Sequence, residues 1–489
     1  MKKTAISLDD FLIGQHLANL AGGAGLRWVG VAGVALLAAG CTMIPKYERP
    51  ASPVPGQYPG GSATNQTDAA DIAWRTFFAE DRLQRLIEVA LANNRDLRVA
   101  ILNVEQSQAQ YHVTRSALFP TVDATGSYTR SGSSAVGLPI GGGSSSFTYN
   151  QWSASLGSTS YEVDLWGRVR SLNKQALENY FATAEGQRNA QISLVAEVAN
   201  MYYQLRQAEE QIELARQTLS VVQESYKLNK ATFDAGASNE LDLRTAEGQV
   251  QTAKISLITY QRQLALSQDA LMLLLGQSIP SDLPAARSFN DTNLLAEVPA
   301  GLPSELIQRR PDILQAEHVL KGANANIGAA RAAFFPAITL TANIGSTSSE
   351  LSRLFSGGTG VWSFSPQISL PIFTGGRNLA NLASAKVGKR IEIANYEKAI
   401  QTAFREVVDA LASMETYTEQ IKEEQTLIVA QQRRFDLANA RYRQGQDSYL
   451  NVLSAQQDLY TAQQDQLQAQ RNQLVSQISL YKALGGGWN

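Results

Sequence analysis

The chain has 489 residues, with 42 Lys and Arg against 44 Asp and Glu, so its formal net charge is −2. This near-neutral balance argues against a nucleic-acid-binding protein, which normally carries a basic face or tail. One cysteine and three scattered histidines exclude an intrachain disulfide and leave no cluster spaced for a metal ion. Past residue 40 no run of 18 apolar residues occurs, so the sequence predicts no transmembrane helix.

The first 40 residues are typical of a secretory signal peptide. About twelve mostly apolar residues, Trp28–Ala39, follow Arg27, and this run is too short to span a bilayer. Small residues then precede Cys41, an arrangement that resembles the bacterial lipobox, where the thiol is acylated and the signal is cut before it. An ordinary signal peptide with an incidental cysteine is the alternative. Because no second cysteine is available for pairing, we favour a lipid such as palmitate on Cys41.

Residues 41–74 are expected to form an extended tether that leads from the lipid to the body of the protein. Five prolines lie between residues 44 and 70 among Gly, Ser and Thr, a composition that disfavours helix. Thr42 follows the cysteine, whereas an aspartate there would favour retention in the inner membrane. The sequence therefore predicts a protein of the outer membrane.

An internal duplication organises the rest of the chain. The segment Arg115–Pro120, RSALFP, recurs 216 residues later as Arg331–Pro336, RAAFFP. Three further landmarks share an offset of 209 residues: Gly167-Arg168 with Gly376-Arg377, Gly236 with Gly445, and Leu275-Gly276 with Leu484-Gly485. Landmarks that keep their order indicate two homologous halves. The predicted segments are a signal peptide (1–40), a tether (41–74), repeat 1 (75–276), a linker (277–303), repeat 2 (304–485) and a tail (486–489).

Each half is predicted to contain two strands with one apolar and one polar face. In the second half, apolar residues alternate with polar ones over 338–344 and 362–372, and the first half shows weaker alternation over 122–128 and 152–156. About ten residues suffice for a tilted transmembrane strand, and about eight strands are needed to close a barrel. Strands in a membrane would therefore require several chains to share one barrel. A soluble sheet packed on one face is the alternative.

Helices and loops are predicted around these strands. Gly- and Ser-rich loops over 131–146 and 346–360 are expected as hairpin ends. The helices that enter each half are expected over 79–117 and 304–333, and the helices that return after the tight turns over 239–275 and 447–484.

The long helices are expected over 167–233 and 376–442, where no proline interrupts a pattern rich in Ala, Gln, Glu, Leu and Arg. Roughly 65 residues at ~1.5 Å each give a rod of about 100 Å, too long and too polar for a bilayer. Gly236 and Gly445 suit left-handed C-terminal caps, so a tight turn is expected at each. A plain antiparallel coiled coil is the alternative, but it leaves the strands unexplained.

Six stretches of the mature chain carry a family resemblance: Trp74–Asp81, Asn93–Asp96, Tyr161–Arg168, Arg309–Asp312, Ile372–Arg377 and Arg441–Leu450. In these stretches the chain resembles the outer-membrane channel lipoproteins of tripartite efflux systems, the OprM/NodT-like branch of the TolC superfamily. The resemblance implies an α+β, internally duplicated subunit of a homotrimer. Four transmembrane strands per chain would form a 12-stranded barrel, which a long periplasmic α-helical barrel continues. It also implies docking to a periplasmic adaptor and an inner-membrane pump of the resistance-nodulation-division (RND) type.

The resemblance further implies that the tunnel closes at a periplasmic tip, around the turns at Gly236 and Gly445. In this family a leucine and an aspartate four residues later commonly narrow the aperture, with an arginine three residues beyond. The leucine matches Leu450, but Ser454 and Gln457 stand at the other two positions. We therefore expect the closed tip to be held by packing and neutral hydrogen bonds.

The aperture candidates are Leu450, Ser454, Leu241 and Asp242, and Asp458 and Arg443 are possible substitutes for the missing charges. No catalytic residue, metal site or cofactor is predicted beyond the lipid on Cys41. The function expected is a passive exit duct for drugs or toxic compounds, lipid-anchored in the outer membrane and extending into the periplasm. A duct for secreted proteins and a non-channel periplasmic scaffold remain as alternatives.

Overall fold

The computed structural model describes residues 42–58, 72–134, 146–286 and 309–487. Cys41 and the predicted signal peptide lie outside the described residues, as do parts of the predicted tether and linker. The chain divides into two compact units. Of the described residues, the sheet unit comprises 42–45, 116–134, 146–172 and 326–382, and the helical unit comprises 46–58, 72–115, 173–286, 309–325 and 383–487.

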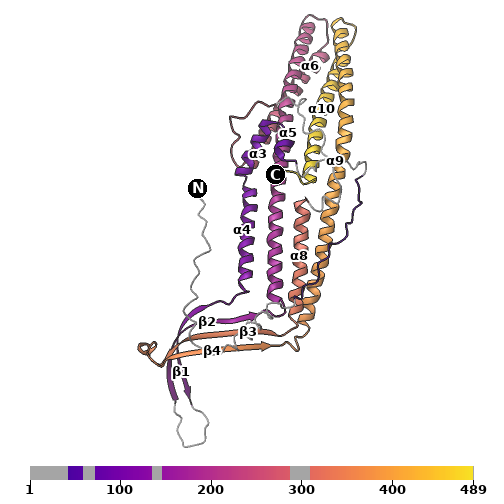
Figure 1. Ribbon diagram of the computed structural model, residues 1–489. Coiled ribbons are helices and arrows are strands. Elements are labelled where there is room, and N and C mark those ends of the chain that lie inside the picture. The colour runs from indigo at the N-terminus through magenta and orange to yellow at the C-terminus, as the bar shows by residue number, and fades with distance from the viewer. Residues whose placement is uncertain (1–41, 59–71, 135–145, 287–308, 488–489) are drawn as a thin grey trace, which may run out of the picture. The chain divides into compact units, whose positions relative to one another are not determined.

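The sheet unit contains one four-stranded antiparallel sheet, in the order β1-β2-β3-β4 (Figure 1). Its strands are β1 (Asp123–Ser134), β2 (Ser146–Val163), β3 (Ala337–Ser348) and β4 (Gly360–Ser369). Each half of the chain therefore supplies one hairpin, as the duplication predicts, and β2 pairs with β3 to join them. The short 3-10 helix η3 (Leu351–Arg353) lies between β3 and β4.

The strand ends differ from the sequence prediction. β1 and β2 extend into the predicted Gly- and Ser-rich loop, because small polar residues there pair across the hairpin, as in Gly132 with Thr148. β3 likewise continues to Ser348, and β4 ends at Ser369, short of the predicted residue 372. Ladder hydrogen bonds thus extend both hairpins at their loop ends, whereas β4 is shorter than predicted at its other end.

Two glycines allow β2 and β3 to approach each other closely. Gly157 pairs with Asn343, and Gly345 pairs with Ser155. A Cβ atom added at Gly157 would collide with the carbonyl oxygen of Ala342, and one at Gly345 would collide with that of Ala154. The join between the two halves therefore depends on residues without side chains.

The helices have bounds close to those expected, with two exceptions. They are α2 (Trp74–Phe77), α3 (Asp81–Asn93), α4 (Arg95–Ser116), α5 (Arg168–Asp234), α6 (Glu240–Leu275), α8 (Pro311–Ala332), α9 (Arg377–Arg443) and α10 (Tyr449–Ala483). The two long helices each contain 67 residues, about 100 Å at ~1.5 Å per residue. The second entering helix, predicted over 304–333, is one exception: Arg310 is not helical, so α8 begins only at Pro311, and residues 304–308 lie outside the described residues.

The other exception is the first entering helix, predicted over 79–117, which is broken into α3 and α4 at Asn94. The Asn94 side chain accepts a hydrogen bond from the amide of Leu97 at 2.8 Å and donates one to the carbonyl of Leu274 at 2.9 Å. An asparagine whose side chain bonds to the backbone competes with helix continuation and favours a cap. The prediction of one continuous helix was therefore wrong.

The core of the helical unit is built around aromatic rings. The ring of Phe77 stacks on that of Tyr481, with centroids 4.1 Å apart, and Phe78 meets the same ring edge-on. The buried hydroxyl of Tyr202 donates a hydrogen bond to Glu80. Among the described residues, none of the helices is long and apolar enough to cross a membrane.

Candidate functional site

The four strands carry an apolar row on one face of the sheet. Antiparallel register pairs Tyr128 with Trp152 and Ile344 with Trp362, and paired residues share a face. The row also contains Leu156, which is 51% exposed, and Ile344, which is 65% exposed. Within the described part of the chain nothing covers this row, although it crosses every strand of the sheet.

The opposite face of the same strands carries hydroxyl and amide groups. The hydroxyl of Thr125 lies 2.8 Å from that of Ser155, and the hydroxyl of Ser127 lies 2.7 Å from that of Ser153. The amide of Gln151 on β2 donates to the hydroxyl of Thr347 on β3 at 3.2 Å. The sheet therefore separates an apolar surface from a polar one, as the period-two alternation predicts.

The turn between α5 and α6 has the predicted left-handed glycine. Gly236 has φ +74°, and its amide donates to the carbonyl of Phe233 at 2.8 Å. Asn239 caps α6, because its side chain accepts a hydrogen bond from the amide of Asp242 at 2.9 Å. The Leu241 side chain is 75% exposed beside this turn.

The turn between α9 and α10 repeats this geometry with different polar groups. Gly445 has φ +70°. The carboxylate of Asp447 accepts hydrogen bonds from the amide of Ser448 at 2.9 Å and from the side chain of Asn451 at 2.5 Å. These hydrogen bonds hold the pKa of Asp447 below its usual range. Leu450 lies three residues after Asp447, and its side chain is 67% exposed.

Ser454 lies in a polar contact between α9 and α10. Arg434 of α9 donates to the hydroxyl of Ser454 at 3.3 Å and forms an ion pair with Asp458 at 2.5 Å. The substitute charge named from the sequence, Asp458, is thus paired within its own chain. Its arginine partner lies on the preceding helix, 24 residues upstream, and sequence reasoning did not find it.

A small core lies behind the two turns. Tyr449 is 2% exposed and clusters with Ala246 of α6 and Val452 of α10. Burial raises the pKa of Tyr449 to about 12, with smaller electrostatic contributions from the neighbouring Tyr442 and Asp242. The hydroxyl of Tyr442 donates a neutral hydrogen bond to Asn229 at 2.7 Å. The two helix pairs are therefore joined here by packing and a neutral hydrogen bond.

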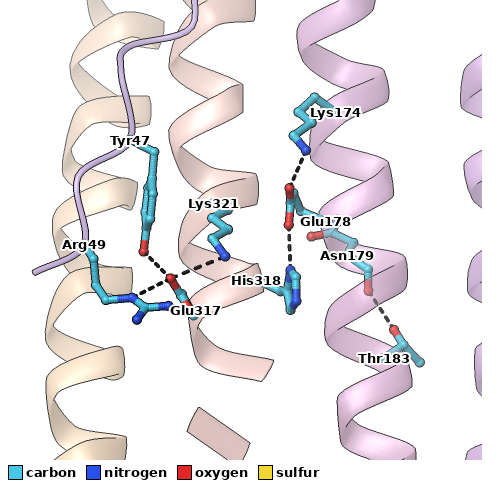
Figure 2. Close-up of polar contacts among 9 residues, drawn as sticks. All are labelled: Tyr47, Arg49, Lys174, Glu178, Asn179, Thr183, Glu317, His318 and Lys321. Atoms are coloured by element: carbon cyan, nitrogen blue, oxygen red, sulfur yellow. Dashed lines mark hydrogen bonds and ion pairs between the residues drawn. The ribbon is translucent and has the colours of Figure 1, made fainter. Parts of the chain in front are cut away.

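A buried carboxylate holds the N-terminal segment of the helical unit against α8. The Glu317 side chain is 3% exposed and accepts hydrogen bonds from the hydroxyl of Tyr47 at 3.1 Å and from Arg49 at 3.0 and 2.8 Å (Figure 2). Lys321 adds an ion pair at 3.3 Å. Burial acts to raise the pKa of Glu317, but these hydrogen bonds and charges hold it below its usual range.

A second buried carboxylate joins α5 to α8. Glu178, whose side chain is 5% exposed, lies 2.6 Å from Nδ1 of His318 and 2.6 Å from the Lys174 ammonium (Figure 2). Burial acts to raise the pKa of Glu178, and the hydrogen bonds from His318 and Lys174 outweigh it and lower the pKa. The described residues contain no group of three or more His, Cys, Asp or Glu that could hold a metal ion.

Arg310, in the Arg309–Asp312 stretch, anchors the end of α10. Its guanidinium donates to the carbonyl of Ala483 at 2.8 Å and pairs with Asp312 at 2.6 Å and Glu406 at 2.8 Å. This buried cation at a helix C-terminus satisfies carbonyls that the helix leaves open. The stretch therefore has a structural role within the helical unit.

The geometry of the strands and helices agrees with a match to a known protein family. The family model described as outer membrane efflux protein matches residues 86–277 and 302–486. The chain belongs to the outer membrane efflux protein family. Its two matched stretches each contain one strand hairpin, one long helix and one returning helix.

Individual members of the outer membrane efflux protein family are similar to this chain over nearly their whole length. The toluene efflux pump outer membrane protein TtgC of Pseudomonas putida is 48% identical over 93% of this chain and 94% of its own. The cation efflux system protein CusC of Escherichia coli is 41% identical over 93% and 97%. The crystal structure of the open state of the MtrE outer membrane channel of Neisseria gonorrhoeae superimposes with a TM-score of 0.83, at 40% identity over 92% and 99%. The chain is an outer-membrane efflux channel.

Proposed function

We propose that three copies of this chain form one passive exit duct across the outer membrane. The observation that carries this proposal is the uncovered apolar row on all four strands, which lies opposite a row of hydroxyl groups. Four strands are too few to close a barrel, whereas twelve suffice. In the proposed 12-stranded barrel, the apolar row faces lipid and the hydroxyl row faces a water-filled lumen.

The helical unit is proposed to continue the duct as an α-helical barrel in the periplasm. Two helices of 67 residues are far longer than the ~30 Å hydrocarbon thickness of a bilayer, and their surfaces are rich in charged and amide side chains. The duct contributes no energy to transport. A periplasmic adaptor and an inner-membrane RND pump are the proposed partners, and the pump drives transport.

We propose that Cys41 carries a covalent lipid and that residues 41–74 form its tether. The described part of this segment is irregular in structure over residues 42–58, and Glu317 holds it through Tyr47 and Arg49. No further cofactor is proposed. Repeat 1 (75–276) and repeat 2 (304–485) are proposed as the duplicated units of the channel, joined by the linker 277–303.

The aperture of the duct is proposed to lie at the turns around Gly236 and Gly445. Leu450 and Leu241 support this position, because both are large apolar side chains that remain more than two-thirds exposed beside a turn. Ser454 and Asp242 contribute hydroxyl and carboxylate groups nearby. The small core around Tyr449, which lies behind the two turns, is proposed to hold the duct in its closed state.

Small toxic compounds are the proposed cargo. The name of one relative specifies toluene and that of another a cation, and the described residues offer no cluster of metal ligands. We therefore favour organic compounds over metal ions as cargo.

A complementation experiment tests this function. The chain is expressed in a Gram-negative strain that lacks its own efflux channel, with and without a matching adaptor and RND pump. We expect toluene tolerance to return only when all three proteins are present. Tolerance that returns without the pump, or a Cys41→Ser variant that is soluble without detergent, would contradict the proposal and favour a periplasmic scaffold.

A further inference from the structure

A polar cavity of about 390 Å³ opens between α5, α6 and α10 within the helical unit. Amide and hydroxyl side chains form most of its wall, including Gln204, Gln207 and Gln211 of α5 and Thr259 and Tyr260 of α6. Among the described residues that line the cavity, Arg471 of α10 is the only charged one. Its volume lies within the range of small-molecule sites, about 300–1,000 Å³.

The guanidinium of Arg471 is poorly satisfied. Nη1 donates to the side-chain oxygen of Asn472 at 3.4 Å, a long and weak hydrogen bond. Nε is buried and has no hydrogen-bond partner among the described residues. No ion pair within 4.0 Å joins Arg471 to a carboxylate in the described part of the chain, and burial lowers its pKa.

Two other arginines of this unit, both with largely buried side chains, do have counter-charges. Arg206, whose side chain is 12% exposed, pairs with both Glu209 and Glu210. Arg310, 8% exposed, pairs with Asp312 and Glu406. A half-buried cation without a counter-charge has lost part of its hydration. Binding an anion compensates for this loss.

The neighbouring side chains are arranged as a neutral hydrogen-bonding wall. Gln207 donates to Gln468 at 2.9 Å, and Gln468 donates to Asn472 at 2.8 Å. This chain of amides fixes the oxygen that Arg471 contacts, so the terminal nitrogens of the guanidinium, which are not among the buried atoms without a partner, are left for a ligand. One guanidinium balances one negative charge, and the fork of its terminal nitrogens matches the two oxygens of a carboxylate.

We propose that this cavity binds a small polyhydroxylated monocarboxylate. The carboxylate lies on the terminal nitrogens of Arg471, and the hydroxyl groups contact the amides of α5 and the hydroxyls of α6. A phosphate monoester, with ≈ −1.5 to −2 charge at neutral pH, would need a second cation that the wall does not supply. This site is separate from the conduction proposed above, and it does not require that the channel be open.

Calorimetric titration of the detergent-solubilised full-length protein with sodium gluconate tests the proposal. We expect saturable binding that is at least tenfold weaker in Arg471→Gln, and no binding of the neutral sugar glucose. Arg471→Lys keeps the charge but lacks the planar edge, so its affinity should fall between the two. Arg405→Gln is the matched control, because Arg405 is an exposed arginine of α9 paired with Asp409 and does not line the cavity. It should bind as the wild type does.

A second variant tests the cavity without touching the charge. Thr259 is exposed at the rim, so Thr259→Trp should fill the cavity, abolish gluconate binding and leave the fold intact, as circular dichroism would show. This variant decides the question if Arg471→Gln fails to fold. The proposal is overturned if the wild type shows no saturable binding, if Thr259→Trp binds normally, or if inorganic phosphate binds as tightly as gluconate.

Discussion

Glu317 shows how a single buried carboxylate determines local structure. Its oxygens receive a phenol, a guanidinium and an ammonium group, and two of these come from a segment some 270 residues earlier in the chain. The sequence places Tyr47 and Arg49 in a proline-rich tether and gives no sign of this contact. Long-range ion pairs depend on which helix face a segment meets, and local patterns carry no information on that.

Replacing Glu317 by Gln should destabilise the protein. Breaking a fully buried pair costs roughly 3–5 kcal/mol, and the Arg49 side chain is 47% exposed, so we expect a loss of about 1–3 kcal/mol. Thermal unfolding in detergent measures it. The control Glu350→Gln removes an exposed pair with Arg353 and should change the free energy of unfolding by less than about 0.5 kcal/mol. Equal effects of the two substitutions would contradict the assigned role.

The same residue predicts a pH dependence. Because the pKa of Glu317 in the folded protein is lowered from its ordinary value of 4.5, its stabilising contribution is complete above that value. It is lost as the pH falls through the lower, folded-state pKa. The difference in melting temperature between wild type and Glu317→Gln should therefore shrink between pH 7 and about pH 3. A difference that stays constant over this range would refute the assignment.

Asp458 tests the proposal that packing holds the tip closed. Its ion pair with Arg434 joins side chains that are 46% and 50% exposed, and such pairs contribute ~0–1 kcal/mol. Asp458→Asn should therefore raise the open probability in bilayer recordings by no more than about fivefold. Asp465→Asn, on the exposed face of the same helix, is the control. An increase well beyond tenfold in Asp458→Asn alone would show that a charged lock dominates over packing.

At the scale of elements, the positions of the strands can be predicted from the sequence, but the register in which they pair cannot. Alternation at residues 338–344 identifies a strand and its apolar face. Pairing between the two hairpins instead depends on the close approach at Gly157 and Gly345, which only three-dimensional neighbours reveal. Asn94 is a similar case, because its bond to Leu274 breaks a helix that periodicity alone would continue.

Gly345→Ala should therefore prevent the two hairpins from pairing. The added Cβ would collide with the carbonyl of Ala154 in the adjacent strand. We expect loss of the heat-resistant oligomer on gel electrophoresis and a lower yield in the outer-membrane fraction. Gly126→Ala is the matched control on β1, since nothing lies within 4 Å of its added Cβ. Identical behaviour of the two variants would rule out this role for the β2–β3 seam.

At the scale of the whole molecule, the duplication predicts most of the architecture. Landmarks offset by 209 residues, such as Gly236 and Gly445, fall at equivalent turns with φ of +74° and +70°. The tip contacts differ between the halves, because Asn239 caps one helix and Asp447 accepts hydrogen bonds at the other turn. Homologous halves therefore share a backbone plan, while the polar contacts at the proposed aperture differ between them and do not follow from the duplication.

The central claim is that copies of this chain enclose one gated conduit. Single-channel conductance in a planar bilayer, with the oligomeric mass determined in the same detergent, tests it most directly. We expect a trimer with small, flickering conductance steps that enlarge when the turns at Gly236 and Gly445 are altered. A monomer that shows no conductance, even with both turns altered, would contradict it.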